Sequence, residues 1–308
     1  MKYAKPALSI QGQIAKLKTR GLLFSDEKAA EHHLRYIGYY RLSAYALFFQ
    51  NSGQPGKPFK PGATFERILE IYDFDRNLRL LALDAIERIE VALRGALSNE
   101  MGRNHGPHWF MEQRHFFPPP QFDHADFLAK LRGEFLLEPD NRGALKPRRP
   151  HQEVFINHYY AKYGEPDLPP SWMTCETLPL GRLSLVYRNL CSRPARQNMA
   201  ASFGADESML RGWLHTLNYV RNLCAHHSRL WNRKMVIKFT VAKQHRQLIS
   251  TGDSAYAVLV VMHELLRHIT PRAHWRERLL ELITTHPAAP LNAMGFPANW
   301  QSEPFWNF

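Results

Sequence analysis

Hydrophobic residues recur along this chain mainly at intervals of three and four, which places them on one face of an α-helix. The clearest case is residues 64–102, where the apolar residues follow one another at steps of 7, 4, 3, 4, 3 and 4. They are Ile71, Leu78, Ala82, Ala85, Ile89, Ala92 and Ala96. The pattern predicts one long helix, with Thr64 as its N-cap and Gly102 as its end.

The same spacing predicts further helices on both sides of this one. Residues 10–50 read as a helix, a short turn at Gly21 and a second helical stretch that begins near an N-cap at Ser25. Later helices are expected near residues 151–163, 179–191, 206–233 and 253–284. Alternating strand patterns are weak, and residues 234–243 are the best candidate strand, with an extended loop as the alternative. The predicted fold class is therefore all-α.

Two stretches interrupt the helical pattern. The Gly/Pro-rich residues 51–62 read as a loop, so residues 1–62 are expected to form an N-terminal helical segment packed on a helical domain of residues 63–308. Residues 103–150 read as a long irregular insert with one short helix at about 123–137. Inserts of this length usually lie at the surface.

Composition adds a partner class and a compartment. The chain has 308 residues, 44% hydrophobic content and a net charge of +12, a balance that favours anionic partners. Its three cysteines form no CxxC pair, which favours a reducing compartment. The N-terminus lacks the apolar core of a signal peptide, and the apolar run at 256–262 is too short to span a membrane. We therefore expect a cytoplasmic protein without a membrane partner.

Positive charge is concentrated in residues 208–252, a window without any Asp or Glu. At the average density of the chain, about four acids would be expected there. Such a window favours a surface that binds a phosphodiester backbone, although an ordinary basic surface would read the same way. The candidate RNA-binding residues are Arg229, Arg233, Lys234 and Lys238.

Inside this window, "RNLCAH" at 221–226 holds the side chains needed to cut RNA without a metal. A histidine, His226, can move a proton at the 2′-hydroxyl or the leaving oxygen, and Arg221 can stabilise the charged transition state. If the helix continues through the motif, Asn222 and His226 share a face and the amide can orient the ring. The spacing alone is weak, because both residue types are common.

Several segments, taken in order, resemble one family. They are "YIGYYRLSAY" at 36–45, "YDFDRNLRLLALDAIERIEVALR" at 72–94, "LPLGRLSLVYRNL" at 178–190, "LRGWLHTLNYVRNLCAHHSRLWNR" at 210–233 and "MGFPANWQSEPFW" at 294–306. Together they resemble the AbiD and AbiF group of Abi-like abortive-infection proteins, and "RNLCAH" resembles the Arg–His motif of HEPN ribonucleases. The run "TLPLG" departs from the Ser-Phe-Gly-like run expected there.

The resemblance implies a HEPN-like helical bundle, an RNA substrate and a role in phage defence. It implies catalytic roles for Arg221, Asn222 and His226, with His227 in support. It also implies a homodimer that joins two motifs in a composite active site, and an antitoxin protein or RNA as a possible further partner. In HEPN folds the helix that corresponds to residues 72–94 packs beside the motif helix, so Glu87 or Glu90 is expected to pair with Arg221 or His226.

Three alternatives remain open at this stage. The chain can be a non-catalytic HEPN-like module that binds RNA or protein. It can hold a metal through His215, Cys224, His226 and His227, although these residues lack the usual ligand spacing, so no metal and no cofactor are expected. Finally, Tyr39, Tyr40 and Arg41 can form a base-stacking platform, although "YIGYY" favours core packing.

Overall fold

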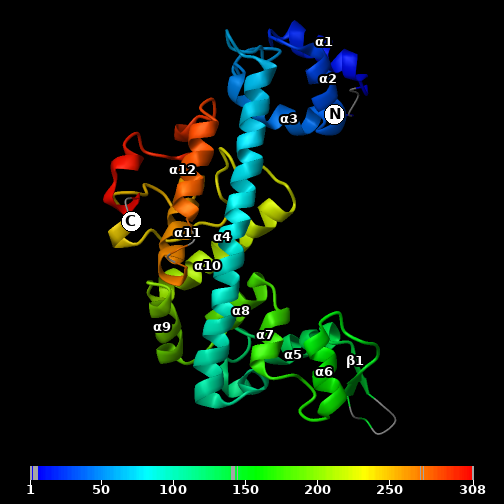
Figure 1. Ribbon diagram of the computed structural model, residues 1–308, viewed down its shortest axis with the longest axis vertical. Helices are drawn as coiled ribbons and strands as arrows, with labels where there is room; N and C mark the ends of the chain where they lie inside the picture. The colour runs from blue at the N-terminus through cyan, green and yellow to red at the C-terminus, as the bar shows by residue number, and fades with distance from the viewer. Residues whose placement is uncertain are drawn as a thin grey trace. The chain divides into compact units, whose positions relative to one another are not determined.

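The chain is mostly helical in a computed structural model that describes residues 2, 6–139, 143, 145–270, 272 and 274–306 (Figure 1). Within these residues the single sheet is a hairpin of two three-residue strands, so the predicted all-α class is confirmed. The helices are α1 Ile10–Thr19, α2 Glu27–Tyr36, α3 Tyr39–Ala46, α4 Phe65–His105, α5 His124–Glu134, α6 Val154–Lys162, α7 Ser171–Thr177, α8 Leu180–Asn189, α9 Arg193–Ser202, α10 Glu207–Ala225, α11 Ala255–Ile269 and α12 Trp275–Thr285. The strands are β1 Leu137–Pro139 and β2 Leu145–Pro147.

The described chain divides into two compact units. The first comprises Met1–Leu81, Leu223–Arg233 and Arg276–Phe308, and the second comprises Ala82–Asn222 and Lys234–Trp275. Helices α4 and α10 each contribute residues to both units. This partition differs from the expected division at residue 62, which stays a prediction.

The long helix is the predicted one, with a different end. The Thr64 hydroxyl accepts a hydrogen bond from the backbone N–H of Arg67 at 3.2 Å, as expected of an N-cap. The helix continues through Gly102 to His105, and Gly106, at a φ of 85°, ends it. The N–H of Gly106 still donates to the carbonyl of Gly102 at 3.0 Å. A glycine stops a helix where it adopts a positive φ, so the second of the two glycines is the stop.

The buried face of α4 also turns relative to the predicted stripe. Ile71, Leu78, Ala82, Ala85 and Ile89 are buried as predicted. Beyond Ile89 the buried residues are Leu93, Leu97 and Met101, whereas Ala92 and Ala96 are half-buried. Successive steps of four advance the buried face around a helix of 3.6 residues per turn. The larger side chains therefore face the second unit's core.

In the first unit, the N-terminal helices pack at the beginning of α4 (Figure 1). The Phe24 ring stacks on that of Phe65 at 5.3 Å, and the backbone of Leu23 is hydrogen-bonded to Ala63 and Phe65. Gly21 has a φ of 89°, as its predicted turn requires. The N-cap of α2 is Asp26, whose carboxylate accepts from the N–H of Ala29 at 3.0 Å; Ser25 was one residue too early.

In the second unit, the insert at 103–150 has a core of its own. The predicted short helix is confirmed as α5, with Asp123 as N-cap. The insert was expected to be an irregular surface segment, but it contains a cluster of buried aromatic residues. They are Trp109, Phe110, Phe116, Phe122 and, on α5, Phe127. The hairpin pairs Leu137 with Pro147 and Pro139 with Leu145. Residues 140–142 and 144 of the expected insert lie outside the described residues.

Of the two readings of residues 234–243, strand and extended loop, the structure has the loop, because this segment forms no ladder with a neighbour. It is held instead by single hydrogen bonds, from the N–H of Met235 to the carbonyl of Asp253 at 2.7 Å and from that of Phe239 to Gly252 at 3.5 Å. The backbone approaches so closely that a Cβ on Gly252 would lie 2.1 Å from the carbonyl oxygen of Phe239. No helix in the described chain has the length and hydropathy needed to cross a bilayer.

Candidate functional site

The motif helix α10 ends inside the predicted motif. It carries Arg221 and Asn222 in its last turns and ends at Ala225, so the predicted helix through residue 233 is wrong. His226 and His227 form a turn in which His227 has a φ of 56°. The N–H of Ser228 closes this turn by donating to the carbonyl of Leu223 at 2.8 Å. His226 is therefore the first residue after the helix, and no hydrogen bond joins it to Asn222 among the described residues.

The candidate catalytic side chains are mostly open to solvent. Asn222, His226 and His227 are exposed and Arg221 is half-buried. Nη1 of Arg221 lies 3.4 Å from Oδ1 of Asn222, a long hydrogen bond. Among the described residues, His226 makes no hydrogen bond or ion pair, so its ring nitrogens are open to a substrate.

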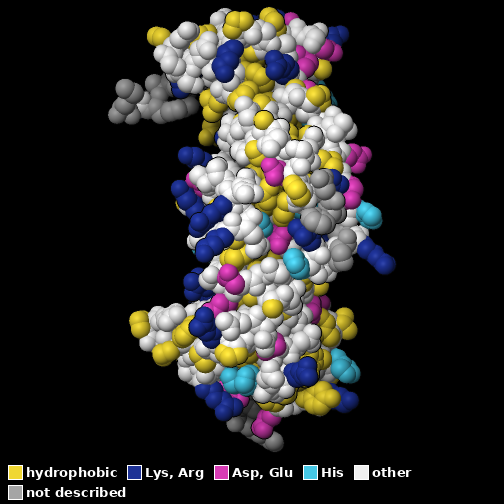
Figure 2. Space-filling model, turned by 90° about the vertical axis from the view of Figure 1, so that its left-hand side faces the viewer, with side chains coloured by type: hydrophobic (Ala, Val, Ile, Leu, Met, Phe, Trp, Pro, Cys, Tyr) yellow, Lys and Arg dark blue, Asp and Glu magenta, His cyan; other side chains and the backbone are white. Residues whose placement is uncertain are grey.

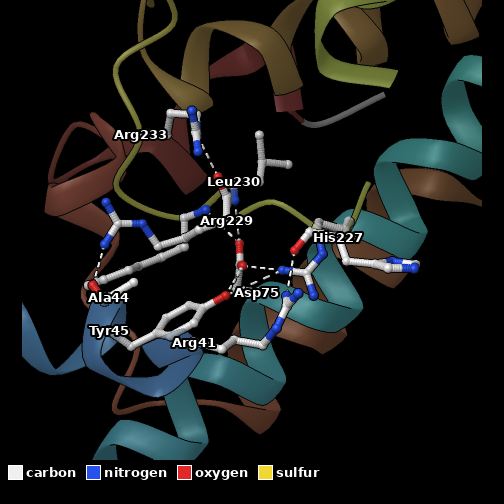
Figure 3. A network of polar contacts seen from close by, with 10 residues as sticks. Arg41, Ala44, Tyr45, Asp75, His227, Arg229, Leu230 and Arg233 are labelled. Atoms are coloured by element: carbon white, nitrogen blue, oxygen red, sulfur yellow. Dashed lines mark hydrogen bonds and ion pairs between the residues drawn. The ribbon is translucent and has the colours of Figure 1, made fainter. Parts of the chain in front are cut away.

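The segment after the histidines is fixed by a buried acid of α4, Asp75 (Figure 3). Its Oδ1 accepts the backbone N–H groups of Leu230 at 2.9 Å and Trp231 at 2.6 Å. Its Oδ2 accepts the Tyr45 hydroxyl at 2.6 Å and forms an ion pair with Arg79. One carboxylate thus joins α3, α4 and the segment that follows the histidine turn.

Burial dominates the electrostatics of this network. It raises the pKa of the Asp75 carboxyl, while Arg79 and the hydrogen-bond donors around it lower that pKa. Burial and the neighbouring Asp75 raise the pKa of Tyr45, so its hydroxyl keeps the proton that it donates. A buried charge is tolerable only when it is paired and hydrogen-bonded, and both oxygens of Asp75 meet that condition.

Three arginines complete the attachment of this segment (Figure 3). Nη1 of Arg41 donates to the carbonyl of His227 at 2.6 Å. The guanidinium of Arg229 donates to the carbonyl of Ala44, and burial lowers the pKa of Arg229. Nε of Arg233 donates to the carbonyl of Arg229 at 2.6 Å. Two of the candidate RNA-binding residues, Arg229 and Arg233, are thus half-buried and engaged within the protein.

The two candidate lysines are exposed instead. Nζ of Lys238 lies 3.1 Å from the carboxylate of Asp253, and the lysine side chain is 66% exposed. The hydrogen bond from Thr251 and that from Lys238 lower the pKa of Asp253. Lys234 is also exposed. More broadly, Lys and Arg side chains occur in several places on the face drawn in Figure 2, with hydrophobic side chains between them.

The expected acidic support of the motif is absent from the described contacts. Glu90 pairs with Arg94 on the same helix at 2.6 Å, and Glu87 is exposed; neither forms a hydrogen bond or ion pair with Arg221 among the described residues, so this support stays a prediction. Besides Asp253, which pairs with Lys238, the basic window uses Asp75, whose role the sequence did not predict. The position of Asp75 in the sequence indicated a buried acid. It lies four residues after Ile71 and three before Leu78, so it places a carboxylate on the apolar stripe.

The described residues include no group of three or more His, Cys, Asp or Glu side chains that could hold a metal ion. Cys224, one of the alternative ligands, is buried, and burial raises the pKa of its thiol to about 12. A thiol with so high a pKa is a poor source of the thiolate that a metal needs.

Core packing was the favoured reading of the tyrosines of "YIGYY", but not all of them are buried. Tyr36 is 75% exposed and Tyr40 is 90% exposed, whereas Tyr39 is half-buried. The buried ring of this region is Tyr45. The exposed rings keep the alternative of a base-stacking platform open.

One comparison with known proteins returns a match. The model of a family described as Abi-like protein matches residues 32–232, which include α3, the Asp75 region of α4 and the Arg221–His226 motif. No curated protein and no solved structure matches the chain.

Proposed function

The chain belongs to the Abi-like protein family, and on this premise we propose that it is a metal-independent endoribonuclease. Membership of the family suggests a role in abortive infection, a form of defence against phage. The proposal adds a substrate, RNA, and a reaction, cleavage of the phosphodiester backbone. It also takes the cytoplasm as the compartment.

The observation that carries this proposal is the way His226 is held. Its side chain is exposed, while the backbone around it is fixed on one side by α10 and on the other by the bonds of Arg41 and Asp75. A group that transfers a proton must be held in place and still be reachable by the substrate. Arg221, in the last turns of α10, supplies a cation close by in the chain.

The proposed reaction needs only one nucleophile, which the RNA provides. The 2′-oxygen attacks the adjacent phosphorus as its proton leaves, and the bond from phosphorus to the 5′-oxygen breaks as that oxygen gains a proton. The products are a 2′,3′-cyclic phosphate and a 5′-hydroxyl. His226 transfers one of these protons, Asn222 and His227 assist it, and Arg221 stabilises the additional negative charge on the phosphoryl oxygens.

Two proton transfers call for two groups, and each chain supplies one motif. We therefore propose a homodimer in which two copies of Arg221 and His226 form one composite site. Lys234 and Lys238 position the RNA backbone, and an antitoxin protein or RNA can hold the enzyme inactive. Mixing the Arg221→Ala and His226→Ala chains tests the composite site: partial recovery of activity supports it, and a fully active monomer in light scattering contradicts it.

The direct test of catalysis is cleavage of total cellular RNA by the purified protein, with and without EDTA. We expect fragments in both conditions, and loss of cleavage by at least 100-fold in Arg221→Ala and His226→Ala, the scale of one transition-state donor or a general acid–base group. The matched controls are Arg211→Ala and His215→Ala, which change exposed residues of the same helix. Equal cleavage by His226→Ala and His215→Ala would show the assignment to be wrong.

A second candidate function is a non-catalytic module that binds RNA or a protein. One observation favours it, namely that no described side chain orients the ring of His226. On this hypothesis the wild-type protein binds RNA and leaves every RNA intact, and His226→Ala changes affinity no more than any other single contact.

A further inference from the structure

The second unit contains a groove of about 460 Å³ that none of the motifs explains. One wall is β2 with the residues that follow it, 148–150, and the other is the second half of α6 with residues 163–164. Its volume lies in the range of about 300–1,000 Å³ that is typical of ligand sites. The groove belongs to the insert and adjoining helix, for which the sequence offered no role.

The groove is lined by positive charge. Lys146, Arg148 and Arg149 contribute to the lining, and among the described lining residues there is no Asp or Glu. Nη1 of Arg148 lies 3.3 Å from Glu138, but these side chains are 72% and 58% exposed, and such surface pairs hold weakly. Arg149 is exposed and has no hydrogen-bond or ion-pair partner among the residues that the structure describes. The lining therefore suits a polyanion.

The α6 wall is fixed by its own hydrogen bonds. The side-chain amide of Asn157 accepts from the N–H of His151 and donates to its carbonyl, each at 2.7 Å. The Tyr160 hydroxyl donates to the carbonyl of Asp167 at 2.9 Å, and burial raises its pKa. The polar groups of this wall are satisfied within the protein, so it keeps its shape without a ligand.

An aromatic ring stands open at the end of this wall. Tyr163 is 48% exposed, and its ring packs against that of Tyr159 at 5.4 Å. The ammonium of Lys162 lies 5.6 Å from the centroid of the Tyr163 ring. In the described part of the chain the Tyr163 hydroxyl has no hydrogen-bond partner, so no hydrogen bond of the side chain holds the ring in this position. An open ring beside cations offers a face on which a nucleobase can stack.

We propose that this groove binds single-stranded RNA, with Arg148 and Arg149 on the phosphates and an unpaired base stacked on Tyr163. The choice of RNA over other polyanions rests on the proposed function. The open ring beside the cations suits a chain that alternates phosphates with unpaired bases, and in a duplex the bases are already stacked on one another. The groove is thus a second RNA-binding site, separate from the cleavage motif in the sequence.

The test measures binding by the full-length protein, with a fluorescein-labelled single-stranded oligoribonucleotide and fluorescence anisotropy across several salt concentrations. The variant is Arg148→Ala with Arg149→Ala, and its control is Arg103→Ala with Arg188→Ala, which removes two exposed arginines elsewhere in the second unit. We expect at least tenfold weaker binding in the groove variant. The slope of log affinity against log salt should fall by about 1.4, since each phosphate contact to a single strand contributes about 0.7. Equal affinity and slope in the two variants would overturn the proposal.

The ring is tested separately. Tyr163→Ala should weaken binding by about fivefold or more, whereas Tyr163→Phe, which keeps the ring, should bind as the wild type does. Equal affinity of the Ala and Phe variants would contradict stacking. Neither arm depends on cleavage: groove-dependent binding without cleavage refutes the proposed function alone, and cleavage with groove-independent binding refutes this inference alone.

Discussion

Arg229 and Arg233, compared with Lys234 and Lys238, show that one run of positive charge can hold two kinds of residue. All four lie in the acid-free window, within ten residues of one another. The arginines are half-buried and donate to backbone carbonyls, whereas the lysines are exposed. The difference teaches that lack of acids in a sequence window does not measure free charge, because the partners of its cations can come from elsewhere in the chain.

In the first unit, these partners come from α3 and α4. The carbonyl that holds Arg229 belongs to Ala44, and the carboxylate that holds the adjoining backbone belongs to Asp75. Planar guanidinium groups with several donors suit such buried positions better than an ammonium group does. We therefore expect the arginines to govern stability and the lysines to govern RNA binding.

The largest effect is expected from Asp75→Asn. The change removes the buried charge opposite Arg79, which is only 5% exposed, and leaves an amide facing two backbone N–H groups. We expect the free energy of unfolding to fall by about 3–5 kcal/mol, the cost of breaking a buried pair. Urea unfolding followed by tryptophan fluorescence measures it, with the exposed Asp73→Asn as control. Similar unfolding midpoints for the two variants would refute a structural role for Asp75.

Arg229→Ala comes next. It leaves the carbonyl of Ala44 without its donor and removes a half-buried side chain, so the unfolding free energy should fall by about 1–3 kcal/mol. The same urea titration of Lys234→Ala, an exposed neighbour in the sequence, should show a change within about 0.5 kcal/mol. If the two variants unfold alike, the distinction between arginines and lysines fails.

A smaller loss is expected from Tyr45→Phe. This change removes one donor to Asp75 and keeps the buried ring, so it should cost about 0.5–1.5 kcal/mol. A double-mutant cycle with Asp75→Asn checks the contact, because the Tyr45 effect should shrink when the carboxylate is gone. Full additivity of the two changes would argue against the bond.

The smallest effect on stability is expected from Lys234→Ala combined with Lys238→Ala. The unfolding midpoint should hardly move, because exposed residues and weak surface pairs contribute little. RNA affinity should fall, and its salt slope should decrease by about 1.4 if both lysines contact phosphates of a single strand. An unchanged slope in fluorescence anisotropy would assign the RNA backbone to other residues.

The sequence predicted the helical class and most helices, because a buried stripe on a helix repeats locally. It did not predict where α10 ends. The segment after that end is held by Asp75, which lies far from it in sequence and accepts two of its N–H groups. The candidate strand at 234–243 does not form. Its contacts with Gly252 and Asp253 are single hydrogen bonds without the repeating pattern of a sheet.

The candidate site was predicted in part. The motif residues could be named from their chemistry. The turn that presents His226 could not be predicted, because the contacts of Arg41 and Asp75 with this segment are tertiary. The expected support from Glu87 and Glu90 followed from the helix pairing of the resembling family and stays a prediction; in the structure Glu90 pairs with Arg94 on its own helix. The carboxylate of Asp75 on the apolar stripe was the sequence feature that indicated the contact with the segment after the histidines.

The central claim is that His226 acts in the chemical step and contributes little to the fold or to RNA affinity. The most direct measurement pairs the single-turnover cleavage rate of one labelled RNA, at saturating protein, with the affinity for that RNA in the wild type, His226→Ala and His227→Ala. We expect His226→Ala to lose at least 100-fold in rate while binding within about twofold of wild type, and His227→Ala to lose much less. A His226→Ala protein that keeps the wild-type rate, or whose RNA affinity falls as much as its rate, would contradict the account.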